Sequence, residues 1–179
     1  MTASHLDENL IIKMAEGDRD AFSEFYRQTS SAVYGFALSI LRNKHDAEDV
    51  MHDAFIRAYS AAISYRPSGK PMPWLLTIVR NLCLNRIRAG KVCEDISEYE
   101  HLTSASTDDA VDRIVLEQTM GILDSEERQI VVLHALTGLK HREIADILEV
   151  PVGTVLSKYN RALKKMRTEL EGKGYGNDR

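Results

Sequence analysis

The stretch 139-LKHREIADILEVPVGTVLS-157 decides how the C-terminal part of this sequence is interpreted. Its first half has apolar residues at helical spacing, and Pro151 and Gly153 then interrupt the helix. A second helical pattern continues to about Leu170. A short helix, a tight turn and a longer helix form a helix-turn-helix, whose second helix enters the major groove of DNA with its N-terminal half.

The second helix of this motif is basic within a chain that is acidic overall. It contains five Lys or Arg residues and one acid, whereas the 179-residue chain has a net charge of −4. Solvated lysines on an ordinary surface helix would carry the same charge, but the order of helix, turn and basic helix favours DNA binding. The inner-face pattern leaves four residues exposed for this purpose: Ser157, Lys158, Arg161 and Lys164.

The first 92 residues predict four more helices, and the third has an acidic outer face. Asp46, Glu48 and Asp49 lie in its first turn, where they complement the helix dipole. Asp53 continues the same face one turn later. Two interpretations stay open: helix capping with solvation, or a docking surface for basic residues of a partner.

Between the third and fourth helices lies 65-YRPSGKPMP-73, which holds three of the four prolines of the chain. We expect a rigid loop here, with Arg66 and Lys70 as its charges, and a helix from Trp74 to about Val92. One face of that helix is polar, with amides and arginines that suit base edges and phosphates. Tyr59, Tyr65 and Trp74 are expected to cluster beside it, either as core residues or as platforms for unstacked bases.

Residues 93–112 contain seven acids and no base, and their centre has no apolar period. Such a segment is typical of a mobile linker, either a solvated spacer or a strand that imitates nucleic acid in a basic groove. We therefore predict an all-α fold of two small helical domains, 1–92 and 113–171, joined by a flexible acidic linker at 93–112 and followed by a tail at 172–179.

Composition excludes several classes of protein. No apolar stretch approaches the roughly 20 residues that a membrane-spanning helix needs, so we expect no membrane insertion. The first residues lack the basic flank and apolar run of a secretory signal. The two cysteines cannot form a disulfide framework, which favours a reducing cytoplasm.

Two blocks of sequence together resemble a known family. Asp46–Val50 with Asp53–Phe55, followed by Trp74-Leu75 and the stretch from Arg80 to Arg88, resembles sigma region 2. Leu139–Ser157 resembles sigma region 4. In this order and spacing, they are similar to the two-domain extracytoplasmic-function sigma factors of bacterial RNA polymerase.

The resemblance implies a partner for each surface and no catalytic residue, metal or cofactor, since the polymerase is the enzyme. It implies a cytoplasmic protein that binds core RNA polymerase and promoter DNA, with a linker that threads toward the RNA exit channel and an anti-sigma protein as its regulator. The implied polymerase contacts are Asp46, Glu48, Asp49, Asp53 and Arg57. The implied contacts to the minus-10 element are Tyr65, Arg66, Lys70, Trp74, Arg80, Asn81, Asn85, Arg86 and Arg88. The implied contacts to the minus-35 element are Arg142, Thr154, Leu156, Ser157, Lys158, Asn160, Arg161 and Lys164.

The sequence departs from the family pattern at several of these positions. His52 stands where Gln is usual and Asn85 where Asp is common. Leu156 and Asn160 stand where a basic residue and an aromatic residue or His are frequent. An apolar Leu156 favours the methyl group of thymine, so the DNA sequence recognised is expected to differ.

Two other classes of function remain as alternatives. A stand-alone helix-turn-helix regulator would bind duplex DNA without polymerase, as a dimer that matches two half-sites. A metal-dependent redox sensor or enzyme would use Cys83, Cys93 and His101, although their spacing is not that of a zinc site.

Overall fold

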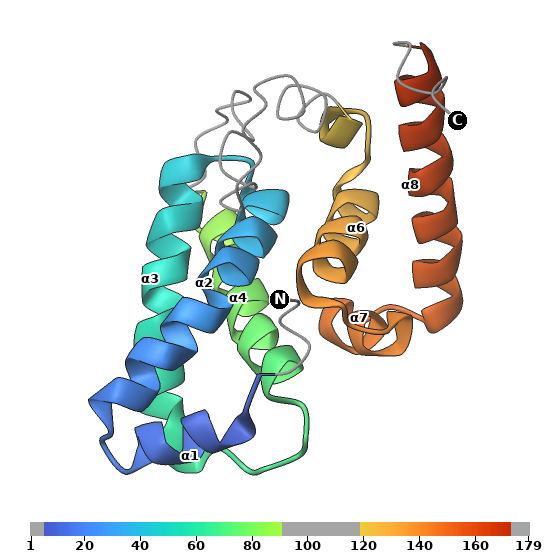
Figure 1. The fold of residues 1–179 in the computed structure, drawn as a ribbon. Coiled ribbons are helices and arrows are strands. Elements are labelled where there is room, and N and C mark those ends of the chain that lie inside the picture. The colour runs from blue at the N-terminus through green and yellow to red at the C-terminus, as the bar shows by residue number, and fades with distance from the viewer. Residues whose placement is uncertain (1–5, 91–118, 173–179) are drawn as a thin grey trace.

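The computed structural model describes residues 6–90 and 119–172, and within these ranges it contains helices and no strand (Figure 1). The predicted linker at 93–112 lies outside the described residues. The all-α prediction and the two helical domains are confirmed. The N-terminal module holds α1 (Glu8–Ala15), α2 (Arg19–Leu41), α3 (Lys44–Ala61), the 3-10 turn η2 (Ala62–Ser64) and α4 (Pro71–Arg88); the C-terminal module holds α6 (Ser125–Thr137), α7 (His141–Leu148) and α8 (Val152–Gly172).

Short polar side chains fix where most of these helices begin. The carboxylates of Asp7 and Asp18 and the amide oxygen of Asn43 accept hydrogen bonds from backbone N–H groups in the first turns of α1, α2 and α3. Asp124 and Glu127 form a reciprocal capping box at the start of α6. These caps bond N–H groups that have no partner within the helix, so each helix starts at a defined residue.

Helix α4 begins earlier than the proline-rich sequence predicted. It starts at Pro71 rather than at Trp74, so the loop after η2 ends at Lys70. The prediction overlooked that proline is well tolerated in the first turn, because its missing N–H would have no helical partner there. The helix also ends at Arg88, four residues before the expected end.

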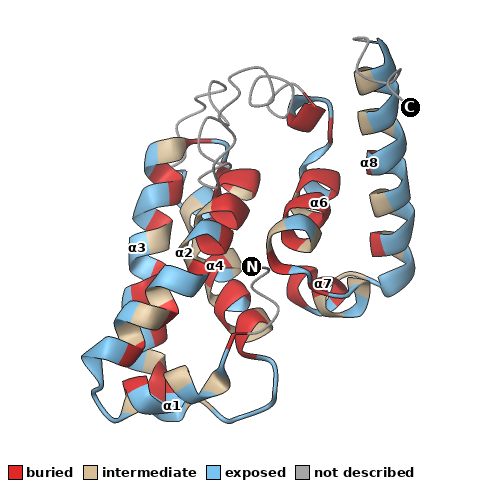
Figure 2. Ribbon diagram, in the orientation of Figure 1, coloured by how far each residue is buried: buried red, intermediate tan, exposed pale blue. Residues whose placement is uncertain are grey.

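The N-terminal module encloses a core of aromatic and aliphatic side chains. Phe25 of α2 and Phe55 of α3 meet edge to face, with ring centroids 6.0 Å apart. Leu75 and Val79 of α4 are fully buried against the same core. Buried residues line the inner sides of α2, α3 and α4, and exposed residues cover the outer sides (Figure 2).

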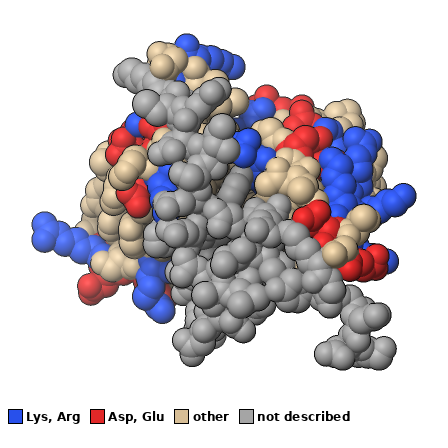
Figure 3. Space-filling model, turned by 90° about the horizontal axis from the view of Figure 1, so that it is seen from above, with Lys and Arg blue, Asp and Glu red and all other residues tan. Residues whose placement is uncertain are grey.

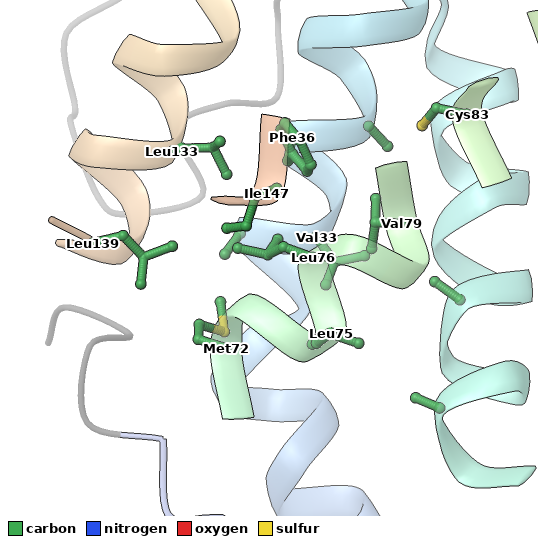
Figure 4. Packing of buried hydrophobic residues seen from close by; sticks show 14 of the residues in the cluster. Val33, Phe36, Met72, Leu75, Leu76, Val79, Cys83, Leu133, Leu139 and Ile147 are labelled. Atoms are coloured by element: carbon green, nitrogen blue, oxygen red, sulfur yellow. The ribbon is translucent and has the colours of Figure 1, made fainter. Parts of the chain in front are cut away.

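The two modules share one hydrophobic core, which the sequence did not predict. Helix α6 packs along α2, and α7 packs against α4. Ile147 of α7 points toward Val33 and Phe36 of α2 and lies beside Leu76 of α4 (Figure 4). Leu133 of α6 reaches the same cluster, so apolar side chains from both modules exclude water together.

Polar bonds reinforce this contact at two places. The buried guanidinium of Arg128 in α6 donates to the carbonyl of Ser39 in α2 at 3.5 Å and to the carbonyl of Leu123 at 2.8 Å. Arg80 of α4 donates to the carbonyl of Leu148, the last residue of α7.

None of the described helices combines the length and apolar character needed to span a bilayer.

The shared core predicts that unfolding of the two modules is coupled. Ile147→Ala, a change within α7, should lower the free energy of unfolding by about 2–5 kcal/mol, because it leaves a cavity between the modules. Trp74 of α4, the only tryptophan of the chain, reports the N-terminal module. Its fluorescence in a urea titration should therefore shift to a lower midpoint in Ile147→Ala.

Leu163→Ala is the control for that titration, because Leu163 is a large exposed residue of α8. It should leave the Trp74 midpoint almost unchanged. In Ile147→Ala, the urea midpoint measured by circular dichroism could fall while the midpoint measured by Trp74 fluorescence stays the same. That result would contradict coupled unfolding of the two modules.

Candidate nucleic-acid interface

Helix α3 presents three acids to solvent and buries a fourth. Glu48, Asp49 and Asp53 are exposed, whereas Asp46 is buried and its side chain is only 8% exposed. The predicted acidic docking face is therefore formed by the three exposed acids. Asp46 lies beneath them and bonds within the module instead.

Arg86 of α4 joins this acidic cluster to the helix that was predicted to contact DNA. Its guanidinium lies 2.6 Å from Asp46 Oδ1 and 2.8 Å from Asp49 Oδ2. Burial opposes the charge of Arg86, but its bonds to Asp49 and Asp46 outweigh this effect and raise its pKa. The side chain is 23% exposed, so Arg86 holds α3 and α4 together and is a poor candidate for a DNA contact.

Arg57 lies one helical turn after Asp53 on α3 and also borders α4. It lines a groove of about 440 Å³ between α3 and α4, together with Asn81 and Asn85 of α4. The apolar wall of this groove includes Ile56, which is 66% exposed. The structure thus places Arg57 beside the predicted DNA-binding amides.

The loop before α4 is held in place by the carboxylate of Glu8. Glu8 Oε1 accepts bonds from the Tyr65 hydroxyl at 2.5 Å and from the backbone N–H groups of Ser68 at 2.7 Å and Gly69 at 2.9 Å. The Tyr65 hydroxyl and then the Ser68 amide lower the pKa of Glu8. Burial, followed by the bond to Glu8, raises the pKa of Tyr65 to about 12.

The aromatic residues near this loop are only partly arranged as predicted. Tyr65 and Trp74 are half-buried and meet edge to face, with centroids 4.8 Å apart. Tyr59 does not join them, because its ring packs edge to face on Phe22 at 5.4 Å. Arg66 and Lys70 are exposed on either side of the turn.

Some of the α4 residues predicted to contact DNA are exposed, whereas others bond within the protein. Asn81, Asn85 and Arg88 are exposed and follow one another at helical spacing. Arg80 faces the C-terminal module, where its guanidinium lies 3.2 Å from Glu149 Oε1.

The predicted DNA-reading face of α8 is open to solvent. Leu156, Ser157, Asn160, Arg161 and Lys164 are exposed, while Val155 and Ala162 on the opposite side are buried. Thr154 at the start of the helix is half-buried, and Arg142 of α7 is exposed. Figure 3 shows basic side chains grouped on the side of the molecule where α8 lies.

Two lysines of α8 bind acids within the module. Lys158 lies 3.1 Å from Glu126 and 3.5 Å from Asp124, and these bonds, that to Glu126 foremost, raise its pKa. Lys165 lies 2.6 Å from Glu127, a carboxylate with no exposed surface. Both lysines therefore attach α8 to α6, which lowers the positive charge available to DNA.

Stacked rings fix the turn of the helix-turn-helix. His134 of α6 stacks on His141 of α7 with centroids 5.2 Å apart, and Tyr159 of α8 meets both rings edge to face. Glu149, the residue after α7, has the left-handed backbone conformation at φ 58°. One ring from each helix thus sets the angle at which α8 leaves the turn.

The described residues do not support the metal or redox alternative. Burial raises the pKa of Cys83 to about 12, so this thiol is a neutral core residue. No cluster of three metal-ligating side chains occurs within residues 6–90 and 119–172. Cys93 and His101 lie outside the described part of the chain.

Glu8 has no local sequence signal, because its partners lie 57 to 61 residues away. Arg86 likewise has no local signal for its bonds, because Asp49 and Asp46 lie 37 and 40 residues before it. Both become visible only when the helices are packed.

Comparison with known proteins assigns this arrangement to a family. The chain matches Sigma-70 region 2 over residues 25–92 and Sigma-70 region 4 over residues 113–166. It is 32% identical to the ECF RNA polymerase sigma factor SigW of Bacillus subtilis over 176 residues, which cover 89% of this chain and 94% of the relative. The chain belongs to the extracytoplasmic-function sigma factors. Its role is that of an RNA polymerase sigma factor in promoter-directed transcription initiation.

Other relatives agree with this assignment. The sigma factor is 28% identical to the ECF RNA polymerase sigma-E factor of Haemophilus influenzae, with 92% of this chain and 95% of the relative covered. Two solved structures share the fold. One is CnrH in complex with the cytosolic domain of CnrY, with a TM-score of 0.65 and 24% identity over 93% of this chain and 97% of that chain. The other is RpoE in complex with the anti-sigma factor NepR from Bartonella quintana, with a TM-score of 0.67 and 21% identity over 84% of this chain and 96% of that chain.

The bonds of Glu8 predict a pH-dependent loop. The pKa of Glu8 is lower in the folded protein than its ordinary value of 4.5, so its stabilising effect is present above pH 4.5 and is lost as pH falls through the folded-state pKa. Glu8→Gln should speed hydrogen exchange of the Ser68 and Gly69 amides at neutral pH. Wild-type protein should show the same change only on acidification, as measured by NMR.

Glu16→Gln, at an exposed acid after α1, serves as the control for the loop. It should leave exchange at Ser68 and Gly69 unchanged. Equal protection of both amides in wild type and Glu8→Gln would show that Glu8 does not hold the loop.

The bridge through Arg86 predicts a large effect on stability. Arg86→Met should lower the free energy of unfolding by roughly 2–4 kcal/mol, because it leaves the buried carboxylate of Asp46 without its cation. Arg88→Met, at an exposed arginine of the same helix, is the matched control for chemical denaturation. Similar losses in the two variants would mean that the bridge adds little.

Proposed function

We propose that the exposed acids of α3 bind core RNA polymerase. Glu48, Asp49 and Asp53 form one negatively charged face, which complements basic residues of a partner. Asp46 supports this face from below through Arg86, and Arg57 belongs to the groove beside α4. In this proposal the sigma factor supplies no catalytic group, because the polymerase is the enzyme, and it works in the cytoplasm.

The loop before α4 and the exposed side of α4 are the proposed contacts to the minus-10 element. The partly exposed rings of Tyr65 and Trp74 suit an unstacked base, since stacking of one base contributes about 1–3 kcal/mol. Asn81 and Asn85 offer amides that hydrogen-bond base edges. The basic residues available to phosphates here are Arg57, Arg66, Lys70 and Arg88.

Helix α8 is the proposed reader of the minus-35 element. The observation that carries this assignment is the exposed face of α8 at the second position of a helix-turn-helix. The proposed contacts are Arg142, Thr154, Leu156, Ser157, Asn160, Arg161 and Lys164, with Lys158 available to DNA only if it leaves Asp124 and Glu126.

A regulatory partner is also proposed. The two solved structures of similar fold contain CnrH with the cytosolic domain of CnrY, and the sigma factor RpoE with the anti-sigma factor NepR. By analogy, an anti-sigma protein would cover the polymerase and DNA faces of this chain until it is released.

Run-off transcription with sigma-free core polymerase and a library of promoter fragments tests the proposed function. Asp53→Arg should reduce transcripts at least about tenfold at limiting core polymerase, because like charges then meet at the interface. Asp53 is preferable to Asp49, whose reversal would also repel Arg86.

Glu16→Arg reverses an exposed acid at the end of α1, on another element than the acidic face, and should transcribe like wild type. Equal loss in both variants would contradict a specific docking face. Absence of transcripts with core polymerase of the natural host, together with binding of the chain alone to duplex DNA, would favour a stand-alone regulator.

A further inference from the structure

The carboxylate of Glu8 binds the loop before α4 at three points. Its Oε1 atom accepts bonds from the Tyr65 hydroxyl at 2.5 Å, the Ser68 N–H at 2.7 Å and the Gly69 N–H at 2.9 Å. Gly69 has the left-handed backbone conformation, at φ 69°, which lets two successive N–H groups converge on one oxygen. The ends of the loop are held by η2 and α4, so Glu8 fixes its middle.

Glu8 is itself rigidly supported. It is the first residue of α1, and Asp7 before it caps the helix. Ile11 and Met14 of the same helix are buried in the N-terminal core, and α1 packs against α2 and η2. Figure 1 shows α1 beside the loop that leads into α4, at the same end of the module. The carboxylate is therefore a fixed point to which the loop is bound.

The bond from Tyr65 to Glu8 also restrains the aromatic rings near the loop. The Tyr65 ring meets that of Trp74 at 65°, with centroids 4.8 Å apart. Because the Tyr65 hydroxyl is held by Glu8, the ring has little freedom to move, and the exposed part of the pair keeps one shape. A site that accepts one base and rejects others needs its rings and hydrogen-bonding groups in fixed positions.

The charge of Glu8 opposes the contact that the loop is proposed to make. Arg66 and Lys70 are exposed cations of the loop that attract DNA phosphates, whereas a carboxylate repels them. If Glu8 acted on DNA through its charge alone, its removal would strengthen binding at every promoter. Its three bonds predict a different result, in which its removal weakens the selection of the correct base.

We propose that Glu8 is a positioning residue for promoter selection, which holds the loop and Tyr65 in the shape that discriminates among bases of the minus-10 element. The inference rests on the proposed function of the loop before α4. In this role Glu8 acts through Tyr65, Ser68 and Gly69 and does not itself contact DNA. Glu8 lies outside residues 25–92, which match Sigma-70 region 2, so helix α1 takes part in the choice of promoter from outside that region.

Run-off transcription with core polymerase and a set of three promoters tests this role. One is a parent promoter from the fragment library, the second carries the minus-10 base change that lowers wild-type transcription most, and the third carries the corresponding minus-35 change. Selectivity is the ratio of the initial transcription rates of parent and changed promoter. Glu8→Ala should lower minus-10 selectivity at least about fivefold, because bonds to a charged acceptor are lost, and should leave minus-35 selectivity unchanged.

Three further variants accompany Glu8→Ala. Glu8→Gln keeps an oxygen that accepts from the two N–H groups, so its minus-10 selectivity should lie between those of wild type and Glu8→Ala. Tyr65→Phe keeps the ring and removes the hydroxyl. Combined with Glu8→Ala, it should lower selectivity by less than the product of the two single effects, because both changes remove the same bond. Glu16→Ala, at an exposed acid after α1, is the matched control and should keep both ratios.

A general loss of stability would lower transcription from all three promoters and leave both ratios at their wild-type values. Wild-type minus-10 selectivity in Glu8→Ala would overturn the positioning role, and so would an equal loss of minus-10 and minus-35 selectivity. Stronger transcription from every promoter with unchanged ratios would indicate a charge effect alone and would overturn it as well. If Glu8→Ala does not fold, wild-type minus-10 selectivity in both Glu8→Gln and Tyr65→Phe would overturn it.

Failure of the proposed function gives a different result. A wild-type chain that transcribes with core polymerase but responds to no minus-10 change would overturn the proposed role of the loop, and the inference with it. In contrast, a wild-type chain that responds to the minus-10 change, with the same response in Glu8→Ala, would overturn the role of Glu8 alone.

Discussion

The burial of Ile147 between α2 and α4 is the contact on which the arrangement of the two modules depends. Helix α7 has only eight residues and places Ile144 and Leu148 as well as Ile147 out of water. A helix this short gains its stability from packing of its apolar sides rather than from its own hydrogen bonds. Once Ile147 is covered by the N-terminal module, α6 comes to lie along α2, and Arg80 meets the end of α7.

Some basic side chains form ion pairs with buried carboxylates of the protein itself, so they are not available to a partner. Arg86 neutralises the buried Asp46, and Lys165 neutralises the buried Glu127, because an unpaired charge out of water is costly. The exposed acids of α3 and the exposed face of α8 are what remain for polymerase and DNA. A count of charges therefore overstates the basic character of α8, whereas the packing shows which of its charges are exposed.

The helices and the family were predictable from sequence because they depend on local signals. Asp18 and Asp124 mark helix starts, and Pro151 with Gly153 marks the turn of the helix-turn-helix. Pairings between distant residues were not predictable: Glu8 with the loop before α4, Arg86 with Asp46, and Arg80 with Glu149. Periodicity shows that a helix has an apolar face and does not show which helix covers it. For the same reason Asp46 was expected on the surface, and the contact between the modules was missed.

The most direct measurement is an electron cryo-microscopy reconstruction of this sigma factor with core polymerase and a promoter that it recognises. The account predicts that the α3 acids face the polymerase and that α8 lies in the major groove of the minus-35 element. A transcribing complex in which the α3 acids face solvent, or in which α8 lies outside the major groove, would contradict it.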